Sequence, residues 1–494
     1  MNERENAYLS AVLFERSFGA EASADFILSD YQTEIRRILH VSQTVLPPSK
    51  YVGNDSAEFN GTIDYQVMYI GADGGIYSIP LSSDYSFSTP IDKAEHKDVI
   101  ADVSVLCSVS PESVSTRVSS PRKLTIKSRL RPCVRAYAKI PATARLGSDA
   151  SPTDVYKRMV STSCVQCECG TSDVFSVSST LPFDSEDIRV VFAESKIDVT
   201  DAQISGNSVC CKGNVLISLL CVSEESGQYK KLTAKTGFEG DVDTEQVLNG
   251  SVRVNGIPSE MSVTITDSGI ECTVGILLQA EVCTDAPVEY TADVYSVKKQ
   301  CDCVMRGVES RSKQLCRTSN FTVSERLPLS STGIPEEAEI LYTTASVNMD
   351  KCDTSDNKYV FSGNGVFTVI YKKEGDVYSS DVSVPIKYLA DAESALPPAC
   401  FDCTAWVLDN NTKVADGNLC IDAEIGISAE CFASNKLSVV DRVVFGEDIP
   451  PREPEIVVCY PSASDSVWSV AKRYKVSPSK IIGDPTTDKF VMIE

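Results

Sequence analysis

Apolar and polar residues alternate with a period of two along most of the chain. The alternation is clearest at residues 63–69, 215–221 and 367–371. A period of two turns successive side chains to opposite faces of a strand, so that one face can pack on a core. Each stretch precedes a short glycine-rich or charged segment, at residues 71–75, 223–227 and 372–376, which is typical of hairpin loops. The pattern predicts antiparallel sheets of short strands.

These stretches belong to a repeat. Gly61, Gly213 and Gly363 lie 152 and 150 residues apart (213−61, 363−213), and an apolar segment begins 23 residues before each of them, at residues 38, 190 and 340. Each unit closes with a further strand, at residues 124–130, 270–276 and 419–425. Repetition at a fixed period indicates one folded unit used three times. We therefore expect a mainly β protein with three antiparallel β-sandwich-like domains.

The pattern becomes helical near the C-terminus. Val467, Val470, Ala471 and Tyr474 follow the i, i+3, i+4, i+7 spacing of one helix face. We expect Ser464 or Asp465 to cap this two-turn helix.

A second helix is expected to begin at Ser477 and Pro478, because serine is a common cap and proline favours the first helical position. Ile481 and Ile482 would then turn inward. With strands at residues 456–460 and 490–493 the order becomes β-α-α-β.

These patterns divide the chain into six parts. A recurring Asp-Val-Tyr motif at residues 154 and 293 is expected to start the second and third units, and a proline-rich, acidic stretch is expected to form a stiff spacer before the last domain. The predicted parts are an N-terminal segment 1–25, repeats 26–150, 151–290 and 291–447, a linker 448–455 and a C-terminal domain 456–494.

Net charge and hydropathy argue against nucleic-acid binding, a membrane span and export. The chain of 494 residues has a net charge of −23, which repels nucleic-acid backbones. No apolar run approaches the roughly 18 residues of a membrane span, and the N-terminus lacks the basic and apolar regions of an export signal. We expect a cytoplasmic protein that binds neither nucleic acid nor the bilayer through a transmembrane segment.

The chain has 19 cysteines and two histidines, His40 and His96. In a reducing compartment we expect free thiols that act as small apolar side chains. A zinc site needs four converging ligands, whereas the two Cys-x-x-Cys pairs, at residues 164–167 and 400–403, lie in different repeats. We predict no metal and no cofactor.

Catalytic motifs are missing from the sequence. We find no phosphate-binding loop, histidine-containing metal motif or nucleophile elbow, and the repeats share no histidine position. The sequence does not exclude a hydrolase that uses a pair of carboxylates. We predict a non-enzymatic protein without catalytic residues.

A cationic stripe occupies alternate positions of one predicted strand. It can bind an anionic surface, or it can pair with acidic residues of its own sheet, which we favour. Its members are Lys123, Lys127, Arg129, Arg131 and Arg135.

Two families are suggested by these residues. The sequence VWSVAKRYKVSP, with its β-α-α-β order, resembles a LysM domain over residues 456–493. The repeats, with FILSDYQTEIRRIL at residue 26 and the Asp-Val-Tyr motifs, resemble SPOCS domains. Three such units and one LysM domain form the layout of SipL-type spore-coat morphogenetic proteins.

The resemblance implies a scaffold in the mother-cell cytoplasm that lies at the forespore surface and helps to assemble the spore coat. Its LysM domain would bind the coat ATPase, a protein similar to stage IV sporulation protein A, and other coat proteins are possible partners. The expected partner-binding residues are Ser464, Asp465, Ser466, Trp468, Lys472, Arg473, Lys475, Asp484 and Pro485.

The LysM motif departs from its usual form at two loops. The family Gly-Asp-Thr-Leu reads Ser-Asp-Ser-Val at residues 464–467, and Asn-Pro reads Asp-Pro at residues 484–485. Loss of the glycine alters the groove where LysM domains hold glycan, because glycine permits close ligand approach. We expect protein docking, with peptidoglycan binding at the cell envelope or spore cortex as the alternative.

Overall fold

The computed structural model describes residues 7–91, 100, 102–146, 154–183, 187–244, 250–392, 395–450 and 456–494. Strands make up 78% of the structure and helices 4%, in several antiparallel sheets. The mainly β prediction is confirmed. Part of the predicted spacer, residues 451–455, lies outside the described residues, as does His96.

The first unit consists of two four-stranded sheets. In one sheet the central strand is β8 (Lys123–Pro141). It pairs with β1 (Tyr8–Ser17), β2 (Ala20–Ile27) and β7 (Asp102–Ser120). In the other sheet β5 is central: its members are β3 (Ile35–Val45), β4 (Ser49–Val52), β5 (Ser56–Gly71) and β6 (Ile76–Pro90). The inward side chains of both sheets share one core, which includes Ile63, Tyr65, Val67, Leu124 and Ile126.

The second unit has a similar arrangement, with a four-stranded sheet and a three-stranded one. Its central strand is β16 (Gly269–Ser296), which pairs with β10 (Val155–Thr171), β11 (Phe175–Leu181) and β15 (Ser251–Thr266). The facing sheet is β12 (Ile188–Ser205), β13 (Ser208–Ser223) and β14 (Tyr229–Asp243).

In the third unit one long strand, β17 (Lys299–Pro328), takes the place that β10 and β11 have in the second unit. It pairs with β22 (Asn418–Asp448), which also pairs with β21 (Cys400–Ala415) and, in parallel, with β9 (Arg145–Leu146). The facing sheet is β18 (Glu339–Ser355), β19 (Lys358–Lys373) and β20 (Asp376–Asp391), reached through the short helix α1 (Leu329–Thr332).

The strand pairing corrects three predicted boundaries. Residues 8–27 pair with β8, so the predicted N-terminal segment is part of the first sheet. The motif at residues 293–295 ends β16, and the third unit begins at Lys299. The third unit also runs to Asp448, one residue beyond its predicted end. The last two errors share one cause: β16, β17 and β22 contain 28, 30 and 31 residues, far more than the usual 3 to 10.

The recurring glycines permit close packing at a bulge. Gly213 and Gly363 lie opposite register shifts in β12 and β18. A Cβ atom at these glycines would lie 2.3 Å from the carbonyl oxygen of Asp198 and 1.9 Å from that of Asn348. In the first unit a Cβ atom on Gly61 would lie 2.5 Å from the ring of Tyr85. The repeat therefore preserves glycine because a side chain would clash with the neighbouring strand or ring.

The three units pack around a common centre. His40, Phe192 and Tyr342 occupy equivalent positions, two residues after the start of each apolar segment. Their rings meet there, with centroids 6.4 Å apart for His40 and Phe192 and 5.7 Å apart for Phe192 and Tyr342. The surrounding apolar cluster draws on all three units and includes Leu39, Val191, Leu341, Met68, Leu220 and Ile370.

Contacts at the rim of this centre run head to tail. Arg37 of the first unit donates to the carbonyl oxygen of Val377 in the third, and Arg189 of the second donates to that of Ile76 in the first, at 3.0 Å. The two arginines are equivalent, and so are the two acceptors, within one residue of the repeat tyrosines. These two contacts between units therefore use the same pair of repeat positions.

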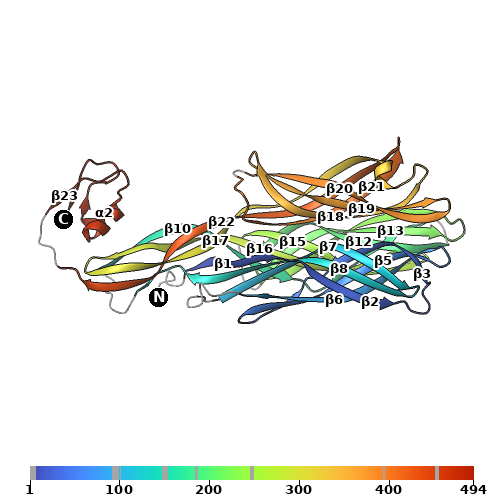
Figure 1. Ribbon diagram of the computed structural model, residues 1–494, viewed down its shortest axis with the longest axis horizontal. Coiled ribbons are helices and arrows are strands. Elements are labelled where there is room, and N and C mark those ends of the chain that lie inside the picture. Colours follow the sequence, from blue (N-terminus) through green and yellow to red (C-terminus); the bar gives the residue numbers. More distant parts are fainter. Residues whose placement is uncertain are drawn as a thin grey trace.

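A narrow stalk extends from the three packed units. Figure 1 shows β10, β16, β17 and β22 running out of the body toward the C-terminal domain. Their side chains form a small core of their own, which includes Ala144, Val294, Val440 and Val443. The long strands thus place the C-terminal domain at one end of the molecule.

Candidate functional site

The C-terminal domain, residues 456–494 and here called the tail, contains one helix and one 3-10 turn. Helix α2 (Val467–Tyr474) begins after Ser466, which caps it in a capping box with Ser469. The cap is therefore one or two residues later than predicted, because the Ser466 hydroxyl reaches the Ser469 amide.

The second predicted helix is only the 3-10 turn Pro478–Lys480, capped by Ser477 as expected. Ile481 and Ile482 form strand β24 instead of turning inward together, and Ile482 is exposed. Ile481 and Ile482 pair with Ile493 and Met492 of the last strand of the tail. This strand pairing takes the place of the second predicted helix.

Asp465 fixes the loop in front of α2. Its carboxylate accepts hydrogen bonds from the Ser462 amide at 2.9 Å, the Ser469 hydroxyl at 3.1 Å and the Arg473 guanidinium at 2.6 Å. The Ser462 amide and Arg473 lower the pKa of Asp465 to about 2. The carboxylate therefore holds the loop with charge-assisted hydrogen bonds.

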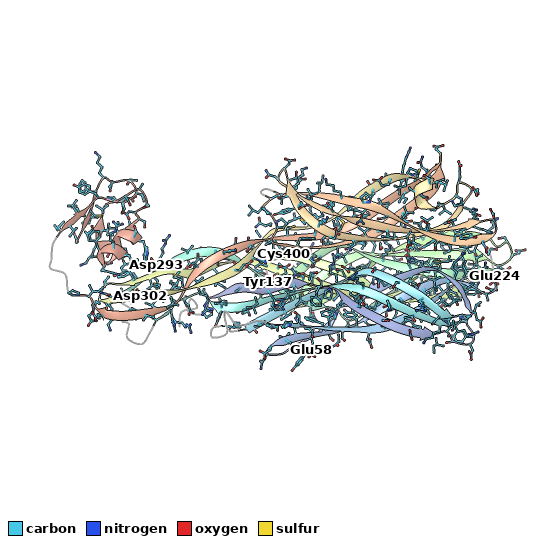
Figure 2. All side chains as sticks on the ribbon, viewed as in Figure 1. Glu58, Tyr137, Glu224, Asp293, Asp302 and Cys400 are labelled. Atoms are coloured by element: carbon cyan, nitrogen blue, oxygen red, sulfur yellow. The ribbon has the colours of Figure 1, made fainter. Side chains whose placement is uncertain are left out.

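The tail docks on the end of the stalk. Asp293 in β16 accepts from the Trp468 indole Nε1 at 2.8 Å and from the Lys472 Nζ at 2.6 Å. Tyr295 donates its hydroxyl hydrogen to the carbonyl oxygen of Val476 at 2.8 Å, and its ring meets Trp468 edge to face at 4.9 Å between centroids. Figure 2 places Asp293 on the stalk directly beside the tail.

Apolar packing continues this contact. Tyr295 is fully buried in a cluster with tail side chains from α2 and the sheet, which includes Val470, Ala471, Val476, Val491 and Ile493. Burial of an aromatic side chain between two parts of a protein stabilises their association more than exposed polar contacts do. The helix side of the tail is thus an interface with its own second unit.

The nine predicted partner-binding residues are now distributed among three roles. Trp468 and Lys472 hold the docked tail. Asp465, Ser466, Arg473 and Lys475 shape the start and end of α2, where Lys475 adopts the left-handed conformation after the helix. Pro485 is buried, whereas Ser464 and Asp484 are exposed loop residues.

A different part of the tail is free and apolar. Strands β23 (Val457–Cys459), β25 (Val491–Ile493) and β24 (Ile481–Ile482) form a three-stranded sheet. Cys459, Val491 and Ile493 face the helix. On the other face Val458 and Ile482 both lie opposite Met492 in the register, and their exposed fractions are 48%, 46% and 36% in the order Val458, Ile482, Met492.

These three side chains, here called the outer row, are part of a concentration of exposed apolar groups. Tyr460 and Phe490 lie near the ends of the same strands, with ring centroids 6.4 Å apart. Among the described residues, 21 large apolar side chains are exposed, and seven of them are in the tail. Exposed apolar patches of this kind mark interaction sites. The signal in the sequence is IVVCY at residues 456–460, which lacks the alternation of a strand with one solvated face.

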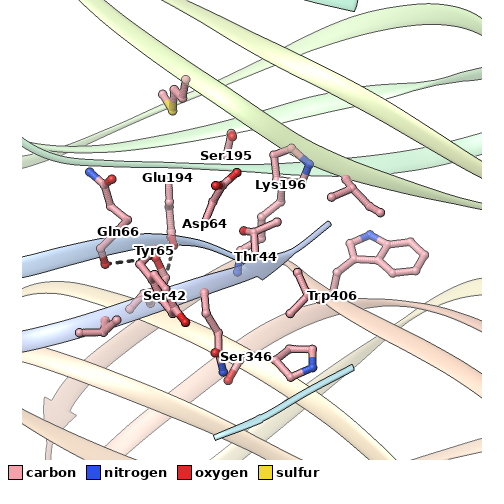
Figure 3. A pocket seen from close by; sticks show the side chains of 18 of the residues that line it. Ser42, Thr44, Asp64, Tyr65, Gln66, Glu194, Ser195, Lys196, Ser346 and Trp406 are labelled. Carbon is pink, nitrogen blue, oxygen red and sulfur yellow. Dashed lines mark hydrogen bonds between the residues drawn. The ribbon is translucent and has the colours of Figure 1, made fainter. Parts of the chain in front are cut away.

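A cavity of about 2250 Å³ lies between the three units. Its lining includes residues at equivalent positions of β3, β12 and β18, which are Ser42, Thr44, Glu194, Lys196, Thr344 and Ser346. Figure 3 labels all of these except Thr344. Glu194 accepts from the hydroxyls of Tyr342 and Thr344, both at 2.7 Å. Lys196 donates to the carbonyl oxygen of Ala345 at 2.9 Å. Glu194 and Lys196 therefore also bind the second unit to the third.

A buried ionic network lies where the three units meet. Arg135, Glu281 and Glu430 stand 11 residues after Leu124, Ile270 and Leu419, and are therefore equivalent. Three cations and three anions belong to the network and balance in charge: Arg135, Arg253, Lys313, Glu281, Asp402 and Glu430.

Glu281 is the link between the first and second units. Arg135 and Arg253 donate to it at 3.1 and 3.0 Å. Burial disfavours its charge, but the two guanidinium groups outweigh this effect and hold the pKa of Glu281 at about 2. An ionised carboxylate is stable at this depth only because it is paired.

Cys167 and Cys283 lie beside this carboxylate, with all ligand atoms of the three residues within 4.8 Å of one another. Cys283 and burial raise the pKa of Cys167 well above its ordinary value. Glu281 already neutralises two arginines, so its charge is committed to the network.

Three of the five cations in the β8 stripe pair with acidic residues of their own sheet, as favoured from the sequence. Lys123 binds Asp25 at 2.9 Å, Arg129 and Arg131 bind Glu112, and Arg135 belongs to the ionic network. The stripe therefore stabilises its own molecule.

Within the described residues, no helix is both long and apolar enough to cross a membrane. No family model matches the chain, and no curated protein matches its sequence.

Proposed function

We propose that this protein is a non-enzymatic scaffold of spore-coat assembly, recruited to the forespore surface when its tail binds a coat ATPase similar to stage IV sporulation protein A. The proposal places the protein in the mother-cell cytoplasm. It combines the resemblance of the repeats and the tail to SPOCS and LysM domains with the surface of the tail.

The outer row carries the proposal. With the helix side of the tail docked on Asp293 and Tyr295, the free surface is the apolar side of the sheet, with Val458, Ile482 and Met492 across it. Such a flat apolar row fits an apolar surface of a protein partner. Sugars are bound mainly by aromatic stacking and hydrogen bonds, which the three aliphatic side chains of the row do not supply. The exposed rings of Tyr460 and Phe490 beside the row are the feature that favours the glycan-binding alternative.

The rest of the molecule supports a scaffold. Three units joined by buried ion pairs and a shared aromatic centre form one body, and the stalk holds the tail away from it. The charged residues described at the central cavity are engaged in contacts between units. This arrangement presents a binding module at a fixed position, as assembly proteins require.

Binding by the full-length protein to the purified coat ATPase and to insoluble peptidoglycan tests the proposal. We expect a stable complex with the ATPase on size-exclusion chromatography, and no sedimentation with the glycan. Sedimentation with peptidoglycan without an ATPase complex would replace the proposal with the glycan-binding alternative.

A further inference from the structure

Two thiols of the third unit face each other across its core. The Sγ atoms of Cys352 in β18 and Cys431 in β22 are 3.6 Å apart. The two strands belong to different sheets, β18-β19-β20 and β17-β22-β21. Cys431 is fully buried, whereas Cys352 is half-buried at the edge of the same core.

From this geometry we propose that Cys352 and Cys431 are a site of disulfide formation, at which a two-electron oxidant joins the two sheets of the third unit covalently. A disulfide needs the two sulfurs to approach to about 2.05 Å. The observed separation requires a small closing movement, which a half-buried side chain such as Cys352 makes by changing its rotamer.

The order of reaction follows from exposure. Cys352 is the more accessible thiol, so its thiolate attacks the oxidant first. Its hydrogen bond with Cys431, together with burial, raises the pKa of Cys431, which makes Cys431 a poor first nucleophile. Once Cys352 carries a leaving group, the adjacent sulfur of Cys431 is the nearest nucleophile inside the core.

The chemistry balances with an azo oxidant such as diamide. The Cys352 thiolate adds to one nitrogen of the N=N bond, and the other nitrogen takes a proton. The Cys431 sulfur then attacks the Cys352 sulfur, an S–S bond forms and the S–N bond breaks. The two thiols lose two electrons and two protons in total, and the azo compound leaves as the hydrazine.

Two other thiols lie near Cys431, so the proposal must say which thiol Cys431 joins. Cys400 and Cys403 of β21 belong to the same region, and both contribute to the raised pKa of Cys431. Among the described residues all 19 cysteines are free. The proposal selects Cys352–Cys431 because their sulfurs lie 3.6 Å apart and belong to two different sheets.

Peptide mapping after oxidation tests the site. The folded full-length protein is treated with diamide, remaining thiols are alkylated, and the digest is analysed by mass spectrometry without reduction. We expect a linked peptide pair containing Cys352 and Cys431, and a Tm several degrees above that of the reduced protein, because the cross-link restricts the unfolded chain.

The variant Cys352→Ala should lose both the linked pair and the rise in Tm on oxidation, while Cys210→Ser, in the second unit, should keep both. Its half-buried position makes Cys352→Ala compatible with folding, which circular dichroism checks. Alkylation of both Cys352 and Cys431 after oxidation, or a link from Cys352 to Cys403, would overturn the proposal.

Discussion

The indole of Trp468 donates a hydrogen bond to the carboxylate of Asp293, 175 residues earlier in the chain, at 2.8 Å. The same carboxylate accepts from Lys472 at 2.6 Å. Both tail residues were expected to meet a partner, and in the structure they meet the stalk. A partner that binds the docked tail must therefore use another surface, and the outer row supplies one.

Loss of the Asp293 charge should loosen the tail. The variant Asp293→Asn keeps the size of the side chain but loses the attraction to the Lys472 ammonium, a contact to a charged group. We expect faster amide exchange in residues 467–476, measured by hydrogen–deuterium exchange, with the rest of the protein unchanged. The control Asp302→Asn, an exposed residue of β17, should leave exchange unchanged. Equal exchange in both variants would mean that apolar packing alone holds the tail.

Breaking the buried ionic network should destabilise the body strongly. Arg253 binds Asp402 at 2.6 Å and Glu281 at 3.0 Å, and Arg253→Met would leave both anions with a missing partner. We expect a loss of about 3–5 kcal/mol in the free energy of unfolding, measured by urea denaturation. The control Lys212→Ala removes an exposed pair with Glu239 and should change the free energy of unfolding far less, because solvent screens exposed ion pairs. Equal losses of unfolding free energy in the two variants would show that burial does not determine how strongly an ion pair stabilises this protein.

His40 should make stability depend on pH. Burial lowers the pKa of His40 below its ordinary value of 6.5. The unfolded chain then binds a proton at a higher pH than the folded one, so stability is complete above about 6.5 and falls as pH decreases below it. In the variant His40→Phe, which matches the equivalent Phe192, we expect this part of the pH dependence to vanish in melting curves at pH 5 to 7.5. An unchanged slope would assign it to other groups.

Gly363, which lies opposite a bulge, and Gly307, which does not, offer a matched pair of substitutions. A Cβ atom on Gly363 would lie 1.9 Å from the Asn348 carbonyl oxygen, whereas one on Gly307 would meet no heavy atom within 4 Å. We expect Gly363→Ala to cost about 1–3 kcal/mol, as overpacking does, and Gly307→Ala to be close to neutral or stabilising, by up to about 1 kcal/mol. Thermal denaturation of both variants measures this, and equal effects would contradict the packing argument.

The sequence was sufficient for the strands and the repeat. Alternation at residues 63–69 and its equivalents predicts the central sheets because one face is buried throughout. It did not reveal that β16 continues through residues 291–296, since no turn residue or change of period separates the two units there.

The site was less predictable for a physical reason. Trp468 and Lys472 carry the signature of a contact surface, but the sequence does not say which surface they contact. Asp293 lies in a different unit, and only the length and direction of β16 bring it to the tail. The capping of α2 by Ser466 was off by one or two residues, since several adjacent side chains are capable caps.

The affinity of the full-length protein for the coat ATPase, compared with that of Met492→Lys, tests the proposed function most directly. A lysine at the centre of the outer row would place a charge in an apolar contact, so we predict at least about a tenfold loss of affinity. The control Val444→Lys replaces an exposed apolar residue of β22 and should bind normally. Equal affinities for the wild type and Met492→Lys would contradict the account.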